Sequence, residues 1–406
     1  MFDFATIGLN TAINAFAAAS DTAVVGAVIK VIQRSIEAMT KSLGGAAIIL
    51  RGIFTNGVNP GTLDFILKTP KDLFTFLYDL ARPSTVYNDG FPNGNPYNEL
   101  DLRRPENVNA VICQVQRVAL TITAILKLPR EHVPPSGLGS LNINISLQSD
   151  FDKDGNPPPP TYISRLPEGT ESSAPKEKWL FINGIANEFI WFQRSCDKIR
   201  DTFAREVKGV YNRSDGILWD LIECAGERSV ATSNALVERT QSSKAAQEML
   251  EHVLRETLWP VGEAAPDKVI MIAHSQGCLI LRLALQRLVT ETTGSDLKEK
   301  LGIFTFGNPS IDWEVIKDGQ QQPLDNYVAL TEHFAHEKDY VAKLGVVSHK
   351  DDYHGGSTFF SKEMKGHLFG AHYPLAANAY DEGKDSRLMK AVNGNEISFK
   401  SGITDN

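Results

Sequence analysis

Ser275 has the surroundings in the sequence that a nucleophilic serine requires. It stands in the segment 273–277 (Ala-His-Ser-Gln-Gly), between a continuous apolar run at 269–273 and a leucine-rich helical pattern at 279–289. So short a turn between a buried strand and a helix presents the serine hydroxyl beyond the carboxyl end of the strand. The alternative role, capping the helix, leaves the small residues around the turn unexplained. We therefore predict that Ser275 is a nucleophile.

Elements that can position such a serine follow one another from residue 178 onward, where short apolar runs alternate with amphipathic helices. This order is typical of a mostly parallel sheet with helices on both faces. The predicted strands are 179–182, 209–211, 269–273, 303–306, 327–335 and 355–360, and the predicted helices are about 188–207, 229–258 and 279–289.

With these elements around it, Ser275 resembles the nucleophile of the α/β-hydrolase superfamily, particularly of its lipase-like members of the class 3 type. The resemblance covers about residues 178–395. Ala273 replaces the first glycine of G-x-S-x-G, a difference of one methyl group, and the segment 302–309 is similar to the strand before the acid in those lipases. The resemblance implies an α/β-hydrolase fold, with an acid and then a histidine after the serine in the chain.

Asp339 is the candidate acid, because it follows the predicted strand 327–335 at the carboxyl edge where a triad assembles. Asp312, just after Pro309, is the alternative. Either carboxylate has a simpler role available, as a helix cap or a turn residue.

His367 is the candidate base, because it follows the predicted last strand 355–360 and precedes the final helix, the place that the resemblance implies. His372 is the alternative, although we expect it more than a turn inside that helix, packed beside Tyr373. His274 points the wrong way to activate Ser275, and we expect it to pack the turn. A neutral imidazole held by a carboxylate would make the serine hydroxyl an effective nucleophile.

Two backbone N–H groups are candidates for an oxyanion hole, the set of donors that stabilises a tetrahedral intermediate. One belongs to Gln276, directly after the serine. The other belongs to Ile185, in the loop after the first predicted parallel strand, where Asn183-Gly184 occupies the place of the His-Gly found in related lipases.

Composition excludes several other classes. The 406 residues are 42% hydrophobic and 22% charged, and 41 basic against 49 acidic residues give a net charge of −8 without a basic cluster, so we expect no nucleic-acid partner. Four dispersed cysteines form no C-x-x-C pair. Neither G-x-G-x-x-G after a strand nor H-E-x-x-H occurs, so we expect no cofactor and no metal. A partial calcium-loop pattern at 150–155 lacks the final glutamate, Thr161 standing there, and a surface turn is the simpler reading.

We expect the region before the sheet to be mainly helical and a catalytic domain to follow it. We place an N-terminal, mainly helical cap region at 1–135 and the catalytic domain at 136–406, with a first strand at 141–147. Residues 4–54 carry one apolar stripe, which predicts a helix on the core, a cap bordering the acyl site, a lipid contact or a dimer interface. The chain has no convincing signal peptide or membrane span, so we expect a cytoplasmic or peripheral membrane location.

These observations predict a serine carboxylester hydrolase of lipase or esterase type, acting on an apolar acyl ester such as a membrane lipid. The alternatives are an acyltransferase, thioesterase or peptidase that uses the same triad, or a non-catalytic scaffold that binds a partner. The oligomeric state stays open at this point.

Overall fold

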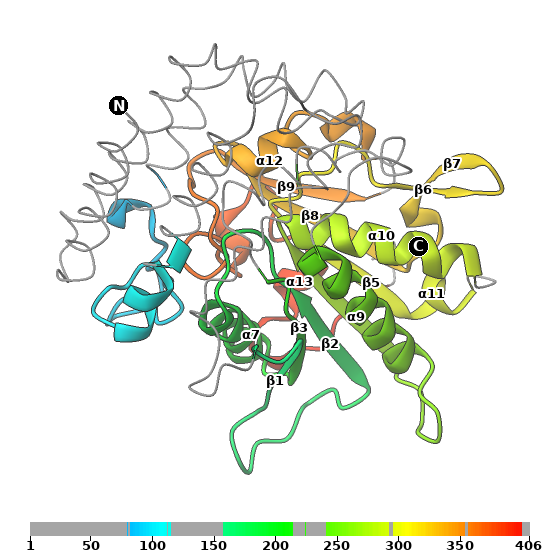
Figure 1. Cartoon of the computed structure of the whole chain (residues 1–406), viewed down its shortest axis with the longest axis horizontal. Helices are drawn as coiled ribbons and strands as arrows, with labels where there is room; N and C mark the ends of the chain where they lie inside the picture. Colours follow the sequence, from blue (N-terminus) through cyan, green and yellow to red (C-terminus); the bar gives the residue numbers. More distant parts are fainter. Residues whose placement is uncertain are drawn as a thin grey trace, which may run out of the picture.

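Seven strands form one mainly parallel sheet in the computed structural model of the chain (Figure 1). The structure describes residues 82–111, 113–114, 157–213, 241–291, 295–353 and 356–399, together with residues 79 and 224. The strand order is β1-β3-β2-β4-β5-β8-β9, and only β1 runs antiparallel to its neighbour. The strands span Thr161–Ser164 (β1), Glu177–Ile182 (β2), Val207–Val210 (β3), Lys268–His274 (β4), Leu301–Phe306 (β5), Leu330–His336 (β8) and Ser357–Ser361 (β9). The molecule is therefore an α/β protein.

Helices cover both faces of this sheet. The helices are α7 (Phe189–Phe203), α9 (Gln241–Leu258), α10 (Gln276–Glu291), α11 (Ser295–Lys300), α12 (Tyr340–Leu344) and α13 (Arg387–Lys390). A separate hairpin of β6 (Glu314–Lys317) and β7 (Gln320–Pro323) projects at the right of Figure 1. Short 3₁₀ turns occur at Pro83–Thr85, Leu324–Asn326, Lys350–Asp352, Ala377–Ala379 and Val392–Gly394.

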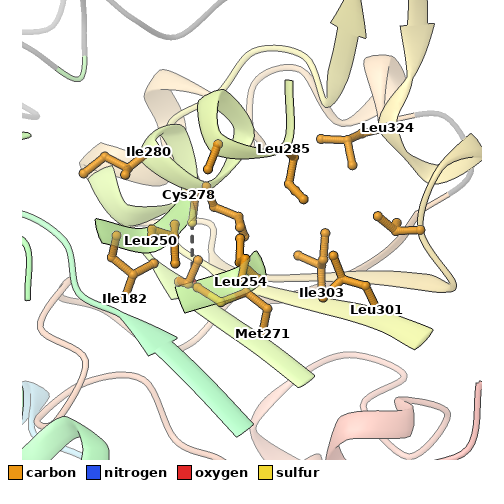
Figure 2. Packing of buried hydrophobic residues seen from close by; sticks show 14 of the residues in the cluster. Ile182, Leu250, Leu254, Met271, Cys278, Ile280, Leu285, Leu301, Ile303 and Leu324 are labelled. Atoms are coloured by element: carbon orange, nitrogen blue, oxygen red, sulfur yellow. Dashed lines mark hydrogen bonds between the residues drawn. The ribbon is translucent and has the colours of Figure 1, made fainter. Parts of the chain in front are cut away.

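Alternating side chains of the strands build two apolar layers. Met271 of β4 and Ile303 of β5 point toward α9 and α10, where they pack with residues such as Leu254 and Leu285 (Figure 2). The next residues along the strands, such as Ile272, point to the opposite face and pack against α7 and α13. This two-sided burial explains why the central strands read as continuous apolar runs.

The direction in which the chain winds changes between β2 and β4. From β2 the chain passes through α7 to β3 on one side, and it then returns through α9 to β4 on the other side of β2. Parallel crossovers are right-handed, so the reversal places α7 on the opposite face from α9 and α10. The loops after β2 and β4 consequently meet at the carboxyl edge of the sheet, the position where open α/β sheets bind ligands.

The predicted strands at 179–182, 269–273 and 303–306 are confirmed, as is the helix after β4. The strand predicted at 355–360 is confirmed from Ser357 onward, where β9 begins. The predicted start of β8 at residue 327 is wrong. Tyr327 follows the 3₁₀ turn Leu324–Asn326, and β8 begins at Leu330. Val328 is apolar because it is buried in the layer under α10, outside the strand.

Several predictions lie outside the described residues: the apolar stripe of 4–54, the strand 141–147, the turn 150–155 and the boundary between 135 and 136. The described part of the predicted first region, residues 82–114, includes helical residues 105–111 and 113–114. Among the described residues, no helix has both the length and the apolar character needed to cross a membrane.

Candidate active site

Ser275 occupies a sharp turn between β4 and α10. Its φ is +57°, a left-handed conformation that is costly for a residue other than glycine. Two hydrogen bonds hold the turn: Ser275 N–H donates to Phe306 O at the end of β5 (2.8 Å), and Cys278 N–H donates to Ser275 O (2.9 Å). The strained backbone is therefore fixed by the neighbouring strand and by the first turn of α10.

Glycines at two neighbouring positions make room for this turn. A Cβ atom on Gly184, in the loop after β2, would lie 2.1 Å from the Cβ atom of Ser275. A Cβ atom on Gly277 would lie 2.7 Å from Asn183 O. The small residues that frame Ser275 in the sequence thus allow β2, its loop and α10 to approach closely.

Ser275, His367 and Asp339 lie in one hydrogen-bonded line. His367 Nε2 is 2.7 Å from Ser275 Oγ, and His367 Nδ1 is 2.7 Å from Asp339 Oδ2. Because a carboxylate only accepts hydrogen bonds, Nδ1 carries the proton and Nε2 presents its lone pair to the serine hydroxyl. All three residues are at most 1% exposed. The structure thus brings together the three residues chosen from the sequence.

The carboxylate of Asp339 is held from three directions. Asp339 caps α12, with Oδ1 accepting a hydrogen bond from Val341 N–H (2.9 Å). Oδ2 accepts from His367 Nδ1–H and also from the hydroxyl of Tyr373 (2.6 Å). Gly307 has φ +60°, and a Cβ atom there would come within 3.0 Å of both Tyr373 Oη and Asp339 Oδ2. Tyr373 is a further residue of the site whose role the sequence did not reveal.

The two candidate oxyanion residues flank Ser275. Gln276 begins α10, and Ile185 follows Gly184, the residue packed against the serine. The side-chain amide of Asn183 binds the backbone of Asn212 as a neighbouring strand would. Its Oδ1 accepts from Asn212 N–H (2.8 Å), and its Nδ2 donates to Asn212 O (2.7 Å). Asn212 Nδ2 also donates to Gln276 Oε1 (2.7 Å). These bonds tie the loop after β2, the loop after β3 and the start of α10 together.

The two alternatives have other contacts. Asp312 forms a buried ion pair with Arg282 (2.8 Å). His372 accepts a hydrogen bond from Leu368 N–H at Nδ1 (3.0 Å), and its Nε2 lies 3.2 Å from Thr85 Oγ1. The expectation that His372 lies inside a final helix is wrong, because residues 369–372 form turns and α13 begins only at Arg387.

His274 packs against the loop that carries His367 and makes a hydrogen bond to it. Its Nε2–H donates to His367 O (2.8 Å), and the two rings lie 4.7 Å apart. Burial, and then the proximity of His367, lowers the pKa of His274 well below its usual value, so the ring is neutral. A neutral ring next to His367 places no like charge on this side of the His367 imidazole.

The chain segments that carry the site also contribute a cluster of buried apolar side chains. They belong to the loop after β2, to α10 and α12, and to the loop after His367: Ile185, Ala186, Leu279, Tyr340, Val341, Leu344, Leu368 and Ala371, with Val86 and Leu100 packed against them. A reaction in such surroundings is shielded from bulk water, which strengthens the electrostatic effect of each nearby dipole.

Within the described ranges, no group of three or more His, Cys, Asp and Glu residues is placed to hold a metal ion. Compared with protein-family models, with curated proteins and with solved structures, the chain matches none of them.

Proposed function

We propose that this chain is a serine hydrolase with an α/β-hydrolase fold, and that it cleaves carboxylic esters with an apolar acyl group. One observation carries the proposal: a hydroxyl, an imidazole and a carboxylate are joined by two 2.7 Å contacts at the carboxyl edge of a parallel sheet. The hydroxyl stands on a strained turn, the feature typical of a serine nucleophile in that fold.

Each residue has a defined task in the proposed reaction. His367 Nε2 takes the proton from Ser275 Oγ as the oxygen attacks the ester carbonyl, and Asp339 stabilises the resulting imidazolium. The backbone N–H groups of Gln276 and Ile185 donate to the oxyanion of the tetrahedral intermediate. His367 then gives its proton to the departing alkoxide. A water molecule repeats the sequence on the acyl-enzyme, releasing the acid and the free serine.

The apolar acyl group is inferred from the side chains around the serine. Ile185, Leu279 and Leu368 would contact an acyl chain more favourably than a peptide. Residues 82–114 border the same cluster through Val86 and Leu100, which supports the idea that the N-terminal region caps the acyl site. Peripheral membrane contact of residues 4–54 stays a prediction.

A fluorophosphonate probe tests this proposal, because it reacts only with an activated serine. We expect the unsubstituted protein to be labelled at Ser275, as located by mass spectrometry of the labelled peptide, and to hydrolyse nitrophenyl esters. Absence of both labelling and ester hydrolysis would favour a non-catalytic scaffold.

A chain-length series of nitrophenyl esters tests the substrate class. We expect kcat/KM to rise from acetyl toward longer acyl chains, since each buried methylene contributes about 0.8 kcal/mol. A preference for acetyl over every longer chain would contradict the lipase-like part of the proposal and leave the serine mechanism standing.

A further inference from the structure

The loop that carries His367 is buried without regular secondary structure. Residues 364–368 are irregular, and turns follow at 369–372. Buried backbone groups need hydrogen-bond partners, which a helix or strand would supply internally. In this loop, several of the partners are buried ionisable side chains.

Glu99 and Lys198 bind opposite kinds of backbone groups in this loop. Glu99 accepts hydrogen bonds from Gly370 N–H and Ala371 N–H, both at 2.7 Å. Lys198, on α7, donates from Nζ to Phe369 O (2.7 Å), Gly370 O (3.1 Å) and Tyr373 O (2.5 Å). A carboxylate and an ammonium group thus hold five backbone groups within a segment of five residues.

Both side chains are almost completely buried, Glu99 being 1% and Lys198 4% exposed. Burying charged groups is costly, and replacing such a pair by apolar residues is often neutral or stabilising. A contribution to stability therefore does not explain well why both charged residues are buried here. Their contacts with the His367 loop explain it better, because the segment that they bind begins two residues after His367.

Other side chains fix the first part of the loop. His336 Nδ1–H donates to Gly366 O (3.2 Å), and His274 Nε2–H donates to His367 O (2.8 Å). Gly366 has φ +86°, and a Cβ atom there would lie 2.5 Å from the ring of His372. The backbone on both sides of the His367 side chain is therefore fixed by contacts from elsewhere in the fold.

We propose that Glu99 and Lys198 are positioning residues for His367: together they clamp the loop at 369–373 and so hold the imidazole in line with Ser275. This inference rests on the proposed function. Neither residue touches Ser275 or Asp339, and their effect passes through the loop backbone. The clamp also makes the region 82–114, which supplies Glu99, part of the catalytic machinery.

The titration of Lys198 gives the clamp a distinctive pH dependence. Burial lowers the pKa of Lys198 to about 7, an effect that the charge of Glu99 opposes. Burial raises the pKa of Glu99, against which its hydrogen bonds from Gly370 and Ala371 work. The other titratable groups that face Lys198 are His274, His336 and His372, and burial lowers the pKa of each, so that they stay neutral. Above neutral pH, Lys198 therefore loses the proton that supplies its third hydrogen bond.

The test compares Glu99→Gln, Lys198→Met and the double variant with Glu177→Gln. Glu177 is the first residue of β2 and forms another buried ion pair, with Arg205 (3.1 Å). Its variant therefore controls for general destabilisation. We expect the three clamp variants to lose about 10- to 100-fold in kcat on a short soluble ester, because small misplacements of a catalytic group have effects of this size. KM should change less than threefold. Glu177→Gln, assayed well below its Tm, should keep kcat within threefold.

The double variant separates positioning from stability, because it leaves no unpaired buried charge. We expect it to regain part of the Tm lost by the single variants while its kcat stays low. Recovery of kcat together with Tm would contradict the clamp. The same holds if both single variants fold and keep kcat within twofold.

A pH profile remains informative if Glu99→Gln and Lys198→Met fold poorly. In the unsubstituted protein, kcat should decline on the alkaline side of neutral pH, and Lys198→Arg, which keeps its charge, should shift that decline upward. An unchanged decline in Lys198→Arg would contradict the role of Lys198.

Hydrogen–deuterium exchange separates failure of the clamp from failure of the proposed function. Peptides covering 366–373 should exchange faster in Glu99→Gln than in Glu177→Gln, whether or not the protein is a hydrolase. If the unsubstituted protein resists the fluorophosphonate probe but exchange rises as expected, the proposed function is wrong and the clamp stands as a loop-holding device. If the probe labels Ser275 but exchange does not rise, the clamp is wrong.

Discussion

Among the described residues, two hydroxyl–imidazole contacts have the same length, and they differ in the backbone that carries the hydroxyl. Ser275 Oγ lies 2.7 Å from His367 Nε2, and Thr305 Oγ1 lies 2.7 Å from His333 Nδ1. All four side chains are buried. Distance and burial alone therefore do not distinguish a nucleophile from a structural hydroxyl.

The difference lies in the backbone that carries each hydroxyl. Thr305 and His333 are register partners within β5 and β8, so their contact is a cross-strand pair in the middle of the sheet. The rings of Trp313 and Tyr353 pack edge-on against His333. Ser275 stands instead beyond a strand end, on a turn whose positive φ directs its hydroxyl away from the sheet.

Replacing each hydroxyl should give the largest contrast between the two sites. Ser275→Ala should lower kcat on a soluble ester by about 10⁴-fold or more, because the nucleophile is lost. Thr305→Val should keep kcat within about twofold and lower the free energy of unfolding by about 1–3 kcal/mol, because His333 Nδ1 loses its partner. Ester kinetics and urea unfolding measure the two quantities. Equal activity of the two variants would contradict the assignment of the nucleophile.

The two aspartates that the sequence offered should differ nearly as much. Asp339→Asn should lower kcat by about 10⁴-fold, because the amide no longer selects the tautomer of His367 that leaves Nε2 free. Asp312→Asn should keep kcat and destabilise the fold by about 3–5 kcal/mol, because it removes one charge of the buried ion pair with Arg282. A large loss of kcat at Asp312 in folded protein would reverse the choice.

A smaller effect is expected from the tyrosine that supports the carboxylate. Tyr373→Phe should lower kcat about tenfold, equivalent to about 1.4 kcal/mol, because Asp339 loses one of its donors and keeps the other two. Tyr380→Phe is the matched control, since its hydroxyl donates to the neutral carbonyl of Pro374 (3.0 Å). If both variants lose activity equally, the effect belongs to aromatic packing and not to the carboxylate.

The sequence predicted the candidate site where the signals were local. A buried run followed by a short turn and a helix favoured Ser275, and the ends of later strands favoured Asp339 and His367. The contacts of Tyr373, Glu99 and Lys198 left no such signal. Lys198 reads as an ordinary polar residue of a helix, and its role depends on carbonyl groups about 170 residues further along the chain.

The two predictions that the structure contradicts, the helix around His372 and the strand start at residue 327, failed because tertiary contacts are not visible in local sequence. The resemblance implied a final helix after His367, with His372 inside it, but backbone groups of that segment bond to side chains from distant elements. Likewise, the apolar segment 327–329 suggested the start of a strand. Val328 is apolar because it is buried, although it lies outside the strand, just after the 3₁₀ turn Leu324–Asn326. In both places tertiary contacts replaced the local pattern.

The Thr305–His333 pair should affect the stability of the protein at acid pH, and this is the smallest effect we expect. Burial lowers the pKa of His333 to about 3 and that of His336 to about 4, against about 6.5 in the unfolded chain. Between the folded and unfolded pKa values, the unfolded state therefore binds more protons than the folded state. Burial of the neutral histidines costs no stability above pH 6.5, and the free energy of unfolding decreases as the pH falls below that value. Each histidine contributes a slope of up to about 1.4 kcal/mol per pH unit.

His333→Gln isolates one of these contributions, because glutamine keeps a polar group near Thr305 and does not titrate. Asp325 acts in the opposite sense: burial raises its pKa to about 6, so its proton uptake adds stability as the pH falls through that value. Because Asp325 is present in both proteins, the difference between their unfolding free energies reports mainly His333. We expect that difference to favour the variant by about 1 kcal/mol more at pH 5.5 than at pH 7.5, with kcat at pH 7.5 unchanged. A difference that does not depend on pH would mean that the pKa of His333 is the same in the folded and unfolded protein, and a loss of kcat would mean that the Thr305–His333 pair takes part in the chemistry.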